Sequence, residues 1–583
     1  MDIYLDANAT TPVLASACAA ALAAMREDFG NPSSVHSAGL RARAVLEATR
    51  ASARRVLGAP SGRLLFVSGA TEGIQTAVLS ALNALRERRR DGAPGPELLL
   101  YGATEHKAVP QALRHWNDLL GLGLRLQAIP VGRDGRHDLA WLRAHAARAG
   151  LVCTMAANNE TGVVSDLDGI GAALAGSQAL WLVDGVQALG KLPLGLVARG
   201  IDYAPFSGHK LYAPKGIGLL YVREGAPFTP LMAGGGQEGG QRSGTENMPG
   251  IAALGAVLAA LESGQVFGSR VASSARRERL AAALHTAFPA LVFNAPPELC
   301  LPTTLNFSVP GVTARLLMDL FDAAGISVSG GSACGAARAE PSHVLEAMGL
   351  PAWQAASAVR LSFGPAVDDA FIAQACARIR ACGAALGQSC AVDREGKGIG
   401  KGVGVGDGDG DGDGDGDGDG AALAAPAADL ERALPNADRR TEARAPRQDA
   451  TGCTSPCDLQ ADEFKALLAA HPELLLVDVR EPFEQALDSS TDLGVAPRHR
   501  RAAPLSALEA ALPELLAAAA EAPVVFFCRS GNRSGEAAQA LRRRGATRAW
   551  SLAGGLALWP RTAAQVAEAD EAEAGAAAGA DPR

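Results

Sequence analysis

The sequence predicts an α/β protein with a mostly parallel sheet, followed by a second, smaller α/β domain. Three observations support this. Short apolar runs alternate with Ala-rich amphipathic helical patterns over residues 1–390, a Gly-Asp repeat then interrupts the chain, and the alternation resumes near residue 455. With 583 residues, the chain is also too long for one ordinary domain.

Apolar runs mark the expected strands, and periodic Ala-rich segments mark the helices between them. In the first region the predicted strands are 64–67, 98–101, 151–156, 180–183 and 217–222, and examples of the predicted helices are 40–57 and 72–90. In the second region the predicted strands are 474–479 and 524–528, and the predicted helix 534–545 ends at a glycine. A further helix is expected to start near Pro341 and Ser342.

Composition sets the expected domain boundaries. Residues 391–450 begin with a Gly-rich and Gly-Asp stretch that cannot bury apolar surface, so we predict a flexible linker there. A calcium site is the alternative for this repeat, but it lacks the larger residues that set ligand geometry in calcium loops. We therefore expect a first domain at 1–390, a second at 451–562 and a disordered Ala/Glu/Asp-rich tail at 563–583.

Charge, hydropathy and cysteine usage exclude several classes of protein. The net charge of −8 does not favour nucleic acid, so we expect no direct contact with it. No signal peptide and no membrane span is indicated, and the ten cysteines show no disulfide spacing, which fits a reducing cytoplasm. Cys453 and Cys457 are half a zinc site without a second pair, so we predict no metal site. They are expected to be free thiols, with a sulfur waystation or a redox pair as the alternative.

A cofactor site is indicated by three strand-end motifs in the first region. Lys210, in FSGHKLYAPKGIG (206–218), follows a predicted strand and a tight turn, where a lysine can bond an aldehyde. The SGATEG segment (68–73) joins a strand to a helix and could hold a phosphate through backbone N–H groups and hydroxyls. A plain N-cap by Thr71 is the alternative for this segment.

Asp184 completes this set, because it ends an apolar strand at the edge where α/β sheets bind ligands. A buried carboxylate there needs a positive partner, such as a protonated pyridine nitrogen. Gln187, three residues on, could reach a phenolic oxygen. An aldehyde, a phosphate, a pyridine and a phenol together describe pyridoxal phosphate.

The order of motifs over 1–390 resembles that of the cysteine desulfurases in the class V aminotransferase group. The matching stretches include YLDANATTP, FGNPSSVH, SGATEG, TEHKAV, AANNETGVV, VDGVQALGKLP, GGGQEGGQRSGTEN, SGGSACGAARAEPSHVL and VRLSFG. The resemblance implies an aminotransferase-like fold with a large cofactor domain at about 15–260 and a small domain at about 265–390 plus the N-terminus. The loop around Cys334 resembles the longer-loop subgroup, whose members often serve iron–sulfur cluster assembly.

The resemblance also implies residue roles. Lys210 resembles the lysine that bonds the cofactor, and His106 the histidine that stacks on its ring. Phosphate contacts are implied for Ala70, Thr71, Ser207, His209 and Thr245, ring contacts for Asn159, Asp184 and Gln187, and substrate contacts for Asn8, Asn159 and Arg360. Arg360 is implied to clamp the carboxylate of L-cysteine. Thr245 resembles a contact donated by the other subunit, which implies a homodimer.

Cys334 lies in the Gly/Ser/Ala-rich stretch VSGGSACGAARAEPSHVL (328–345), where little packing holds a side chain in place. The resemblance implies that its thiolate accepts sulfur from the substrate and becomes a persulfide, leaving L-alanine. A loop that collects sulfur and then delivers it has to move. A selenocysteine lyase or a cysteine lyase on the same scaffold is the alternative.

A second sulfur site is predicted in FFCRSGNRSGEA (526–537). Cys528 ends a strand before a helix, so the loop Cys528-Arg529-Ser530-Gly531-Asn532-Arg533 can point backbone N–H groups at its sulfur. Arg529 and Arg533 are expected to add positive charge. With LLLVDVREPFE (474–484) upstream, the region resembles a rhodanese domain, and the four residues between Cys528 and Arg533 favour sulfur over phosphate chemistry.

One departure from the rhodanese pattern concerns the stretch after the acidic motif, where ALDSSTDLGVAPRHRRAAPLS (486–506) stands in place of the usual sequence. Two sulfur-handling loops on one chain suggest a relay from Cys334 to Cys528 and on to an acceptor protein, such as a cluster scaffold or a thiolation enzyme. A rhodanese domain that only docks partners is the alternative.

Overall fold

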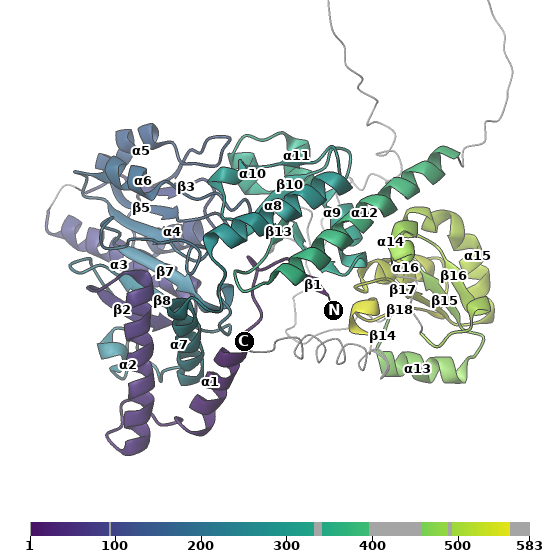
Figure 1. Cartoon of the computed structure of the whole chain (residues 1–583), viewed down its shortest axis with the longest axis horizontal. Helices are drawn as coiled ribbons and strands as arrows, with labels where there is room; N and C mark the ends of the chain where they lie inside the picture. Colours follow the sequence, from purple (N-terminus) through teal and green to yellow (C-terminus); the bar gives the residue numbers. More distant parts are fainter. Residues whose placement is uncertain (1, 93–94, 331–340, 396–456, 488–492, 560–583) are drawn as a thin grey trace, which may run out of the picture. The chain divides into compact units, whose positions relative to one another are not determined.

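The computed structural model describes residues 2–92, 95–330, 341–395, 457–487 and 493–559 (Figure 1). The chain divides into two compact units, Met1–Gly383 and Ala384–Arg583. Cys334, Cys453, most of the predicted linker and the predicted tail lie outside the described residues. The predicted domain boundaries therefore remain proposals.

Seven strands form the large sheet of the first unit, in the order β2-β8-β7-β6-β5-β3-β4. β8 is antiparallel to both of its neighbours, and all other pairs are parallel. The bounds are β2 Arg63–Val67, β3 Leu98–Gly102, β4 Arg125–Ile129, β5 Ala149–Met155, β6 Leu180–Asp184, β7 Tyr203–Ser207 and β8 Gly218–Val222. The five predicted strands are confirmed. β4 and β7 were not predicted, because β4 carries polar side chains and β7 contains a proline.

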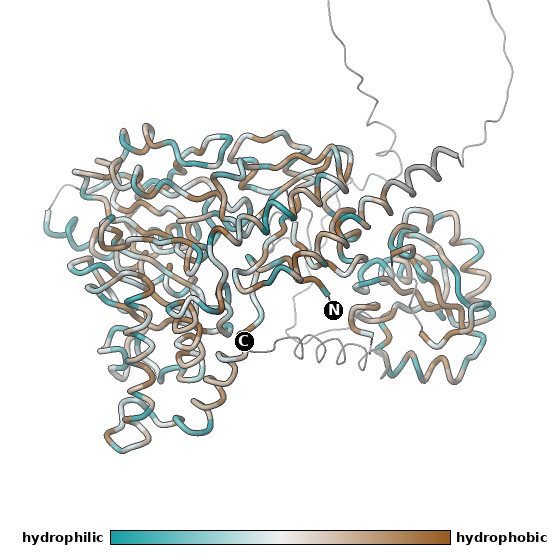
Figure 2. Tube along the Cα trace, in the orientation of Figure 1, coloured by the Kyte–Doolittle hydropathy of each residue, from teal (hydrophilic) through white to brown (hydrophobic). Residues whose placement is uncertain are grey.

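Both faces of this sheet are buried. Leu64 and Phe66 of β2 belong to one apolar core, whereas the alternate residues Leu65 and Val67 belong to another. The first core is closed by α1 Ala15–Arg26, α2 Ser37–Leu57, α5 Leu139–His145, α6 Leu167–Leu174 and α7 Met248–Ser263; the second by α3 Ala70–Arg90 and α4 Ala108–Leu119. Figure 2 shows the chain in the same orientation coloured by hydropathy, with brown, apolar segments throughout the first unit. This arrangement is the predicted α/β fold with helices on both faces.

A second, antiparallel sheet has the strand order β12-β13-β10-β9. Its strands are β9 Val292–Phe293, β10 Thr304–Ser308, β12 Ser329–Gly330 and β13 Val359–Ser362. The helices in the same C-terminal part of the first unit are α8 Arg270–Ala287, α9 Ala314–Ala323, α10 His343–Ala347, α11 Ala352–Ser357 and α12 Asp369–Glu395. The N-terminal strand β1 Ile3–Tyr4 pairs with β11 Ile326–Ser327, so the start of the chain belongs to this part. Ser342 caps α10 by accepting the Leu345 N–H at 3.2 Å, which confirms the predicted helix start.

The second unit has a five-stranded parallel sheet in the order β14-β18-β17-β15-β16. Its elements are β14 Asp458–Leu459, α13 Ala461–Ala470, β15 Leu475–Asp478, α14 Pro482–Leu487, β16 Arg500–Ala502, α15 Leu508–Glu521, β17 Val524–Phe527, α16 Asn532–Arg543 and β18 Ala549–Leu552. The two predicted strands and the predicted helix are confirmed. The stretch that departs from the rhodanese pattern still supplies the edge strand β16.

The second unit contains two basic runs, RHRR (498–501) and RRR (542–544), and one arginine of each makes a contact within the unit. Arg501 pairs with Glu514, and Arg542 donates to the Ala549 carbonyl oxygen at 2.6 Å. These two arginines therefore connect elements of the second unit to one another. Among the helices that the structure describes, none combines the length and the apolar character needed to cross a membrane.

Candidate active site

A cavity of about 690 Å³ lies at the carboxyl ends of β5, β6 and β7. Parallel strands bring their ends to one edge, so residues far apart in the sequence meet there. Eleven predicted site residues line this cavity: Asn8, Ala70, Thr71, His106, Asn159, Asp184, Gln187, Ser207, His209, Lys210 and Arg360. Thr245 is exposed and does not line it.

Lys210 ends the short 3-10 turn Gly208–Lys210, which directly follows β7. Its Nζ donates to the carbonyl oxygens of Asn8 at 2.8 Å and Ala9 at 2.7 Å. The lysine therefore rests against the N-terminal segment, with its amine directed into the cavity. An amine placed in this way can bond an aldehyde and can carry a proton.

Asp184 is the last residue of β6 and is 6% exposed. One carboxylate oxygen accepts the Val186 N–H at 2.9 Å. Burial raises the pKa of Asp184, and the Val186 N–H and the charges of His106 and Lys210 offset this only in part. A cation placed against this carboxylate would favour its charged form. A protonated pyridine nitrogen is such a cation, so Asp184 is suited to pair with it.

His106 lies at the mouth of the cavity with its ring orientation fixed. The Ala108 N–H points at Nδ1 at 3.2 Å, so the proton of the neutral ring is on Nε2. Partial burial lowers the pKa of His106, and the charges of Lys210 and His343 add to this effect, while Asp184 opposes it. A neutral imidazole of this kind can stack on an aromatic ring and move a proton.

The N-terminus of α3 forms an anion cradle. The helix starts at Ala70, and its N-cap is Gly69, which has no side chain to satisfy the first N–H groups. Thr71 is therefore not the N-cap, and the alternative interpretation of this segment is wrong. A Cβ atom on Gly218 would lie 2.9 Å from the Gly69 Cα, so only glycine lets β8 approach this turn so closely.

Ser207 and His209 complete the cradle from β7 and the turn after it. Burial lowers the pKa of His209 to about 4, and the charges of Lys210 and Lys215 act in the same direction. Glu72 in the first turn of α3 accepts the Ser68 N–H at 2.7 Å and pairs with Arg242 at 2.9 Å. Its negative charge is thereby balanced, and the cradle remains suited to an anion.

Arg360 also lines the cavity and is 1% exposed. Its Nη2 donates to Asp6 at 2.5 Å and its Nη1 to the Asn159 carbonyl oxygen at 2.8 Å. Asn8 donates to the same carbonyl oxygen at 3.2 Å. Two of the five N–H groups of Arg360 thus fix the orientation of its planar guanidinium. A guanidinium with a fixed plane is suited to a bidentate contact with a carboxylate.

Glu160 and His343 also line the cavity, and the sequence analysis did not identify them. Glu160 is 1% exposed and accepts the Ser342 hydroxyl at 2.6 Å, while His343 contacts the Glu105 carbonyl oxygen at 3.2 Å. Glu160 directly follows Asn159, and His343 lies in the motif that contains Cys334. This closeness in the sequence is the signal that could have identified them.

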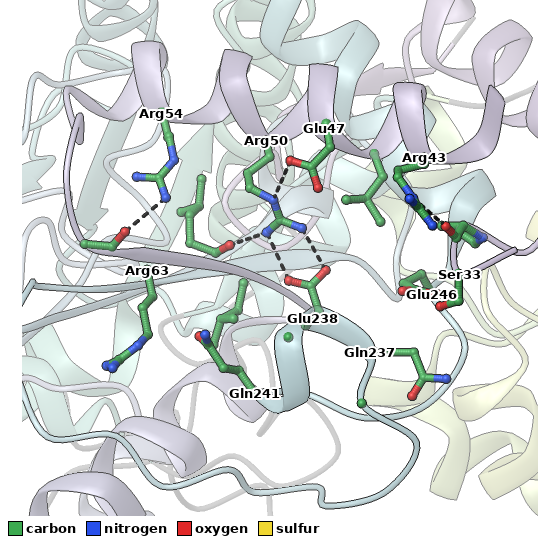
Figure 3. Close-up of a pocket in the computed structure, with 17 residues that line it drawn as sticks. Ser33, Arg43, Glu47, Arg50, Arg54, Arg63, Gln237, Glu238, Gln241 and Glu246 are labelled. Carbon is green, nitrogen blue, oxygen red and sulfur yellow. Dashed lines mark hydrogen bonds and ion pairs between the residues drawn. The ribbon is translucent and has the colours of Figure 1, made fainter. Parts of the chain in front are cut away.

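A second cavity, of about 490 Å³, lies between α2 and the segment that leads to Thr245 (Figure 3). Arg50 of α2 donates to both carboxylate oxygens of Glu238, at 3.0 and 3.1 Å. Glu238 has a φ of +52°, which is unfavourable for a residue with a side chain. The ion pair holds the turn 237–240 in this conformation and so fixes the start of the segment that carries Thr245.

The second unit places Cys528 directly after β17, in front of α16. Its side chain is 0% exposed, and Sγ accepts the Gly531 N–H at 3.1 Å. The Ser534 hydroxyl lies 3.4 Å from the same sulfur and 2.9 Å from the Ser551 hydroxyl. The sulfur thus meets a backbone N–H and one buried hydroxyl, that of Ser534, which is a suitable setting for an anion.

The prediction that Arg533 adds positive charge to the Cys528 loop is wrong. Its guanidinium is 7% exposed and pairs with Glu484, which is 1% exposed, with Nη2–Oε1 at 2.6 Å. The pair joins α16 to α14, and the positive charge is neutralised inside the core. Removing one partner of such a buried pair typically costs about 3–5 kcal/mol, so Arg533 supports the loop through the fold.

Cys457 lies close to this site in the fold. Its side chain is 5% exposed and lies within the apolar core that also contains Cys528. Its backbone carbonyl oxygen accepts the Ser551 N–H at 2.7 Å. In the parts of the chain that the structure describes, no three His, Cys, Asp or Glu side chains are grouped so that they could hold a metal ion.

The lysine, the strand-end aspartate, the neutral histidine and the anion cradle fit the aldehyde, pyridine and phosphate groups of pyridoxal phosphate. The first unit is thus a pyridoxal-phosphate enzyme with an α/β fold. Residues 3–373 match the profile of the family "Aminotransferase class-V", and residues 460–562 match "Rhodanese-like domain". The chain belongs to the class-V aminotransferase family and carries a rhodanese-like domain.

Curated relatives of the chain include cysteine desulfurases. "Cysteine desulfurase 2" of Trichormus variabilis is 40% identical over 353 residues, which span 60% of this chain and 85% of the relative. The "Cysteine desulfurase" of Gluconacetobacter diazotrophicus is 39% identical over 370 residues, which span 63% of this chain and 90% of the relative. Both similarities confirm the predicted resemblance of the first region.

Solved structures show the same fold. A "NIFS-like protein" is 31% identical with a TM-score of 0.57, and the match covers 65% of this chain and 98% of that one. A structure described as "SspA in complex with cysteine" is 27% identical with a TM-score of 0.54, and the match covers 63% of this chain and 99% of that one.

Glu160 leads to a prediction about pH. Burial raises the pKa of Glu160 from its ordinary value of 4.5 to about 7. Between these values the folded chain holds a proton that the unfolded chain has lost, so the stabilising contribution is complete below about pH 4.5 and is lost as the pH rises through 7. Glu160→Gln cannot titrate. Its unfolding free energy should therefore rise relative to that of the unchanged protein by about 3 kcal/mol from pH 4.5 to 8.

Denaturant unfolding of both proteins at several pH values measures this difference. Glu346→Gln, on an exposed position of α10, is the matched control and should show no comparable trend. Parallel pH curves for Glu160→Gln and the unchanged protein would contradict the prediction.

Proposed function

We propose that the chain is a cysteine desulfurase, which transfers the sulfur of L-cysteine to Cys334 and releases L-alanine. The observation that carries this proposal is the position of the Lys210 amine, held by two carbonyl oxygens in the cavity that also contains Asp184 and the anion cradle. The similarity to cysteine desulfurases supports the choice of substrate.

The residues of the cavity divide the work between them. Arg360 clamps the substrate carboxylate, and Lys210 removes the proton from the substrate α-carbon and holds it at Nζ. Asp184 keeps a positive charge next to its carboxylate, and His106 offers a neutral ring with a proton on Nε2. When bound, pyridoxal phosphate supplies the electron sink that stabilises negative charge on the substrate carbon.

Sulfur transfer then depends on the Cys334 thiolate. In this proposal it attacks the substrate sulfur, an S–S bond forms, and the substrate C–S bond breaks. The carbon keeps the electron pair and takes up a proton, which yields L-alanine. The persulfide on Cys334 keeps the sulfur until an acceptor takes it.

The expected result for the full chain loaded with pyridoxal phosphate is L-alanine release from L-cysteine in the presence of a thiol. Lys210→Ala should lower turnover by at least about 1,000-fold, because the proton acceptor is lost. Cys334→Ser should abolish persulfide formation at this position, as read by mass spectrometry, while the visible absorbance of the cofactor remains.

Full turnover with Lys210→Ala would overturn the proposed mechanism. A strong preference for selenocysteine over cysteine, measured as alanine release from each, would instead identify a selenocysteine lyase. Alanine release that needs no acceptor thiol, and that Cys334→Ser leaves intact, would identify a chemistry in which Cys334 takes no part.

We further propose that the enzyme is a homodimer in which Thr245 contacts the phosphate in the partner's cavity. Thr245 is exposed and lines no part of its own chain's cavity. Apolar side chains are also exposed on and between α1 and α2, among them Phe29 at 68% and Val35 at 86%. Exposed apolar groups of this kind are typical of a contact surface.

Mixing two inactive chains tests this arrangement. Thr245→Ala and Lys210→Ala chains, refolded or co-expressed together, form mixed dimers in which one cavity has both residues. If Thr245 acts in the partner's cavity, the mixture should recover about a quarter of the full activity above the Thr245→Ala background. If Thr245 acts in its own chain's cavity, mixing should recover nothing.

The rhodanese-like domain leads to the proposal of a relay, in which Cys528 takes the outer sulfur from the Cys334 persulfide and passes it to an acceptor protein. The N–H and hydroxyl contacts of Cys528 support an anionic sulfur at this position. Covalent linkage of two such domains raises their mutual concentration to about the millimolar range. An iron–sulfur cluster scaffold or a thiolation enzyme is the expected class of acceptor.

Sulfur-labelled cysteine tests the relay. We expect labelled persulfide on both Cys334 and Cys528 of the full chain, and on Cys334 alone in Cys528→Ser. Delivery of label to an acceptor should fall at least about 10-fold in Cys528→Ser while alanine release in the presence of a small thiol is unchanged. Unchanged delivery, with partner binding retained, would show that the domain only docks partners.

A further inference from the structure

Lys191 lies next to the cofactor cavity and has no role in the mechanism described above. It follows β6 in the segment VDGVQALGK (183–191), and its side chain is half-buried. Nζ donates to the Gln187 Oε1 at 3.1 Å and contacts the Asn8 Oδ1 at 3.5 Å. One amine thus binds two side chains that line the cavity.

The amide of Gln187 has two chemically different ends, and only its N–H end can donate a hydrogen bond. The Lys191 amine donates, so the amide oxygen has to face it. On the other side, the Asn8 carbonyl oxygen accepts the Gln187 Nε2 at 3.0 Å. Both neighbours specify the same orientation, and one of the two amide protons then remains for the cavity.

We propose that Lys191 is a positioning residue, which holds the Gln187 amide with its N–H end toward the cofactor's phenolic oxygen. This inference rests on the proposed contact between Gln187 and the cofactor. A flipped amide would place its oxygen against the Asn8 carbonyl oxygen and would present an acceptor to a cofactor oxygen, which is repulsive in both places.

Asn8 depends less on Lys191 than Gln187 does. Its amide also donates to the Thr304 hydroxyl at 3.0 Å and to the Asn159 carbonyl oxygen at 3.2 Å, so its orientation is fixed without the lysine. Gln187 is 3% exposed, and its described partners are Lys191 and the Asn8 backbone. The Asn8 contact is made by a backbone carbonyl oxygen, which a substitution does not remove, whereas a substitution of Lys191 removes its amine.

The interaction does not require one protonation state. Burial lowers the pKa of Lys191 to about 7, and the charges of Lys210 and Arg360 act in the same direction. The protonated amine has three N–H groups and the neutral amine has two, which is enough for both contacts in either form. The amide orientation should therefore persist across neutral pH.

A double-mutant cycle tests the proposal through cofactor binding to the apo full chain, followed by visible absorbance. Lys191→Met removes the donor but keeps an unbranched stem, and we expect it to raise the dissociation constant of pyridoxal phosphate about 10-fold. Lys191→Arg should restore affinity to within about 3-fold, because it donates again. Lys191→Gln, whose tip can donate or accept, should lie between these variants.

The decisive comparison uses Gln187→Ala as the background. There is then no amide to orient, so adding Lys191→Met should change the dissociation constant by less than about 2-fold. Equal effects in the two backgrounds would overturn the proposal, as would unchanged affinity in Lys191→Met with Gln187 present. Thermal melting of each apo variant identifies any loss of folding.

The same experiment separates this inference from the proposed function. If Gln187→Ala leaves cofactor affinity unchanged, the positioning role of Lys191 is wrong, while the desulfurase proposal still depends on turnover by the Lys210 and Cys334 variants.

Discussion

The geometry of the cofactor cavity depends on Asn8, a side chain only 1% exposed. Its backbone N–H donates to the Ser362 hydroxyl and its amide to the Thr304 hydroxyl, both in the small antiparallel sheet. Its carbonyl oxygen accepts from Lys210 and Gln187, which follow strands of the large sheet. One residue of the N-terminal segment therefore connects both parts of the first unit. The position of the reactive amine depends on how these two sheets are packed against each other.

The two sulfur sites differ in the forces that they use. The cavity of the first unit gathers formal charges, since Arg360, Lys210 and the buried Asp184 all line it, in surroundings that shift several pKa values. Around Cys528, the contacts are a backbone N–H and a hydroxyl, while the nearby arginine is paired with Glu484. The first site is suited to separating charge in a substrate, and the second to holding a sulfur atom without further chemistry. This difference agrees with the proposal that the first site releases sulfur from a substrate and the second site carries it.

Local patterns were enough to predict part of this arrangement. Asp184 and Lys210 follow strongly apolar strands, and the SGATEG segment joins a strand to a helix, so each could be placed at one edge of a parallel sheet. The partner of Arg533 could not be predicted, because Glu484 lies 49 positions away and the pairing depends on how two helices pack. The pKa of Glu160 depends on burial, which is a property of the assembled cavity. Strands β4 and β7 have mixed composition, and their neighbours in the sheet determine their conformation.

The complete burial of Cys528 also affects its resistance to oxidation. Peroxides attack exposed thiolates and convert them stepwise to sulfenic and sulfinic acids. A sulfur with 0% exposure is shielded from peroxides in this conformation, and the same shielding means that the loop has to open before Cys528 can take sulfur from a persulfide.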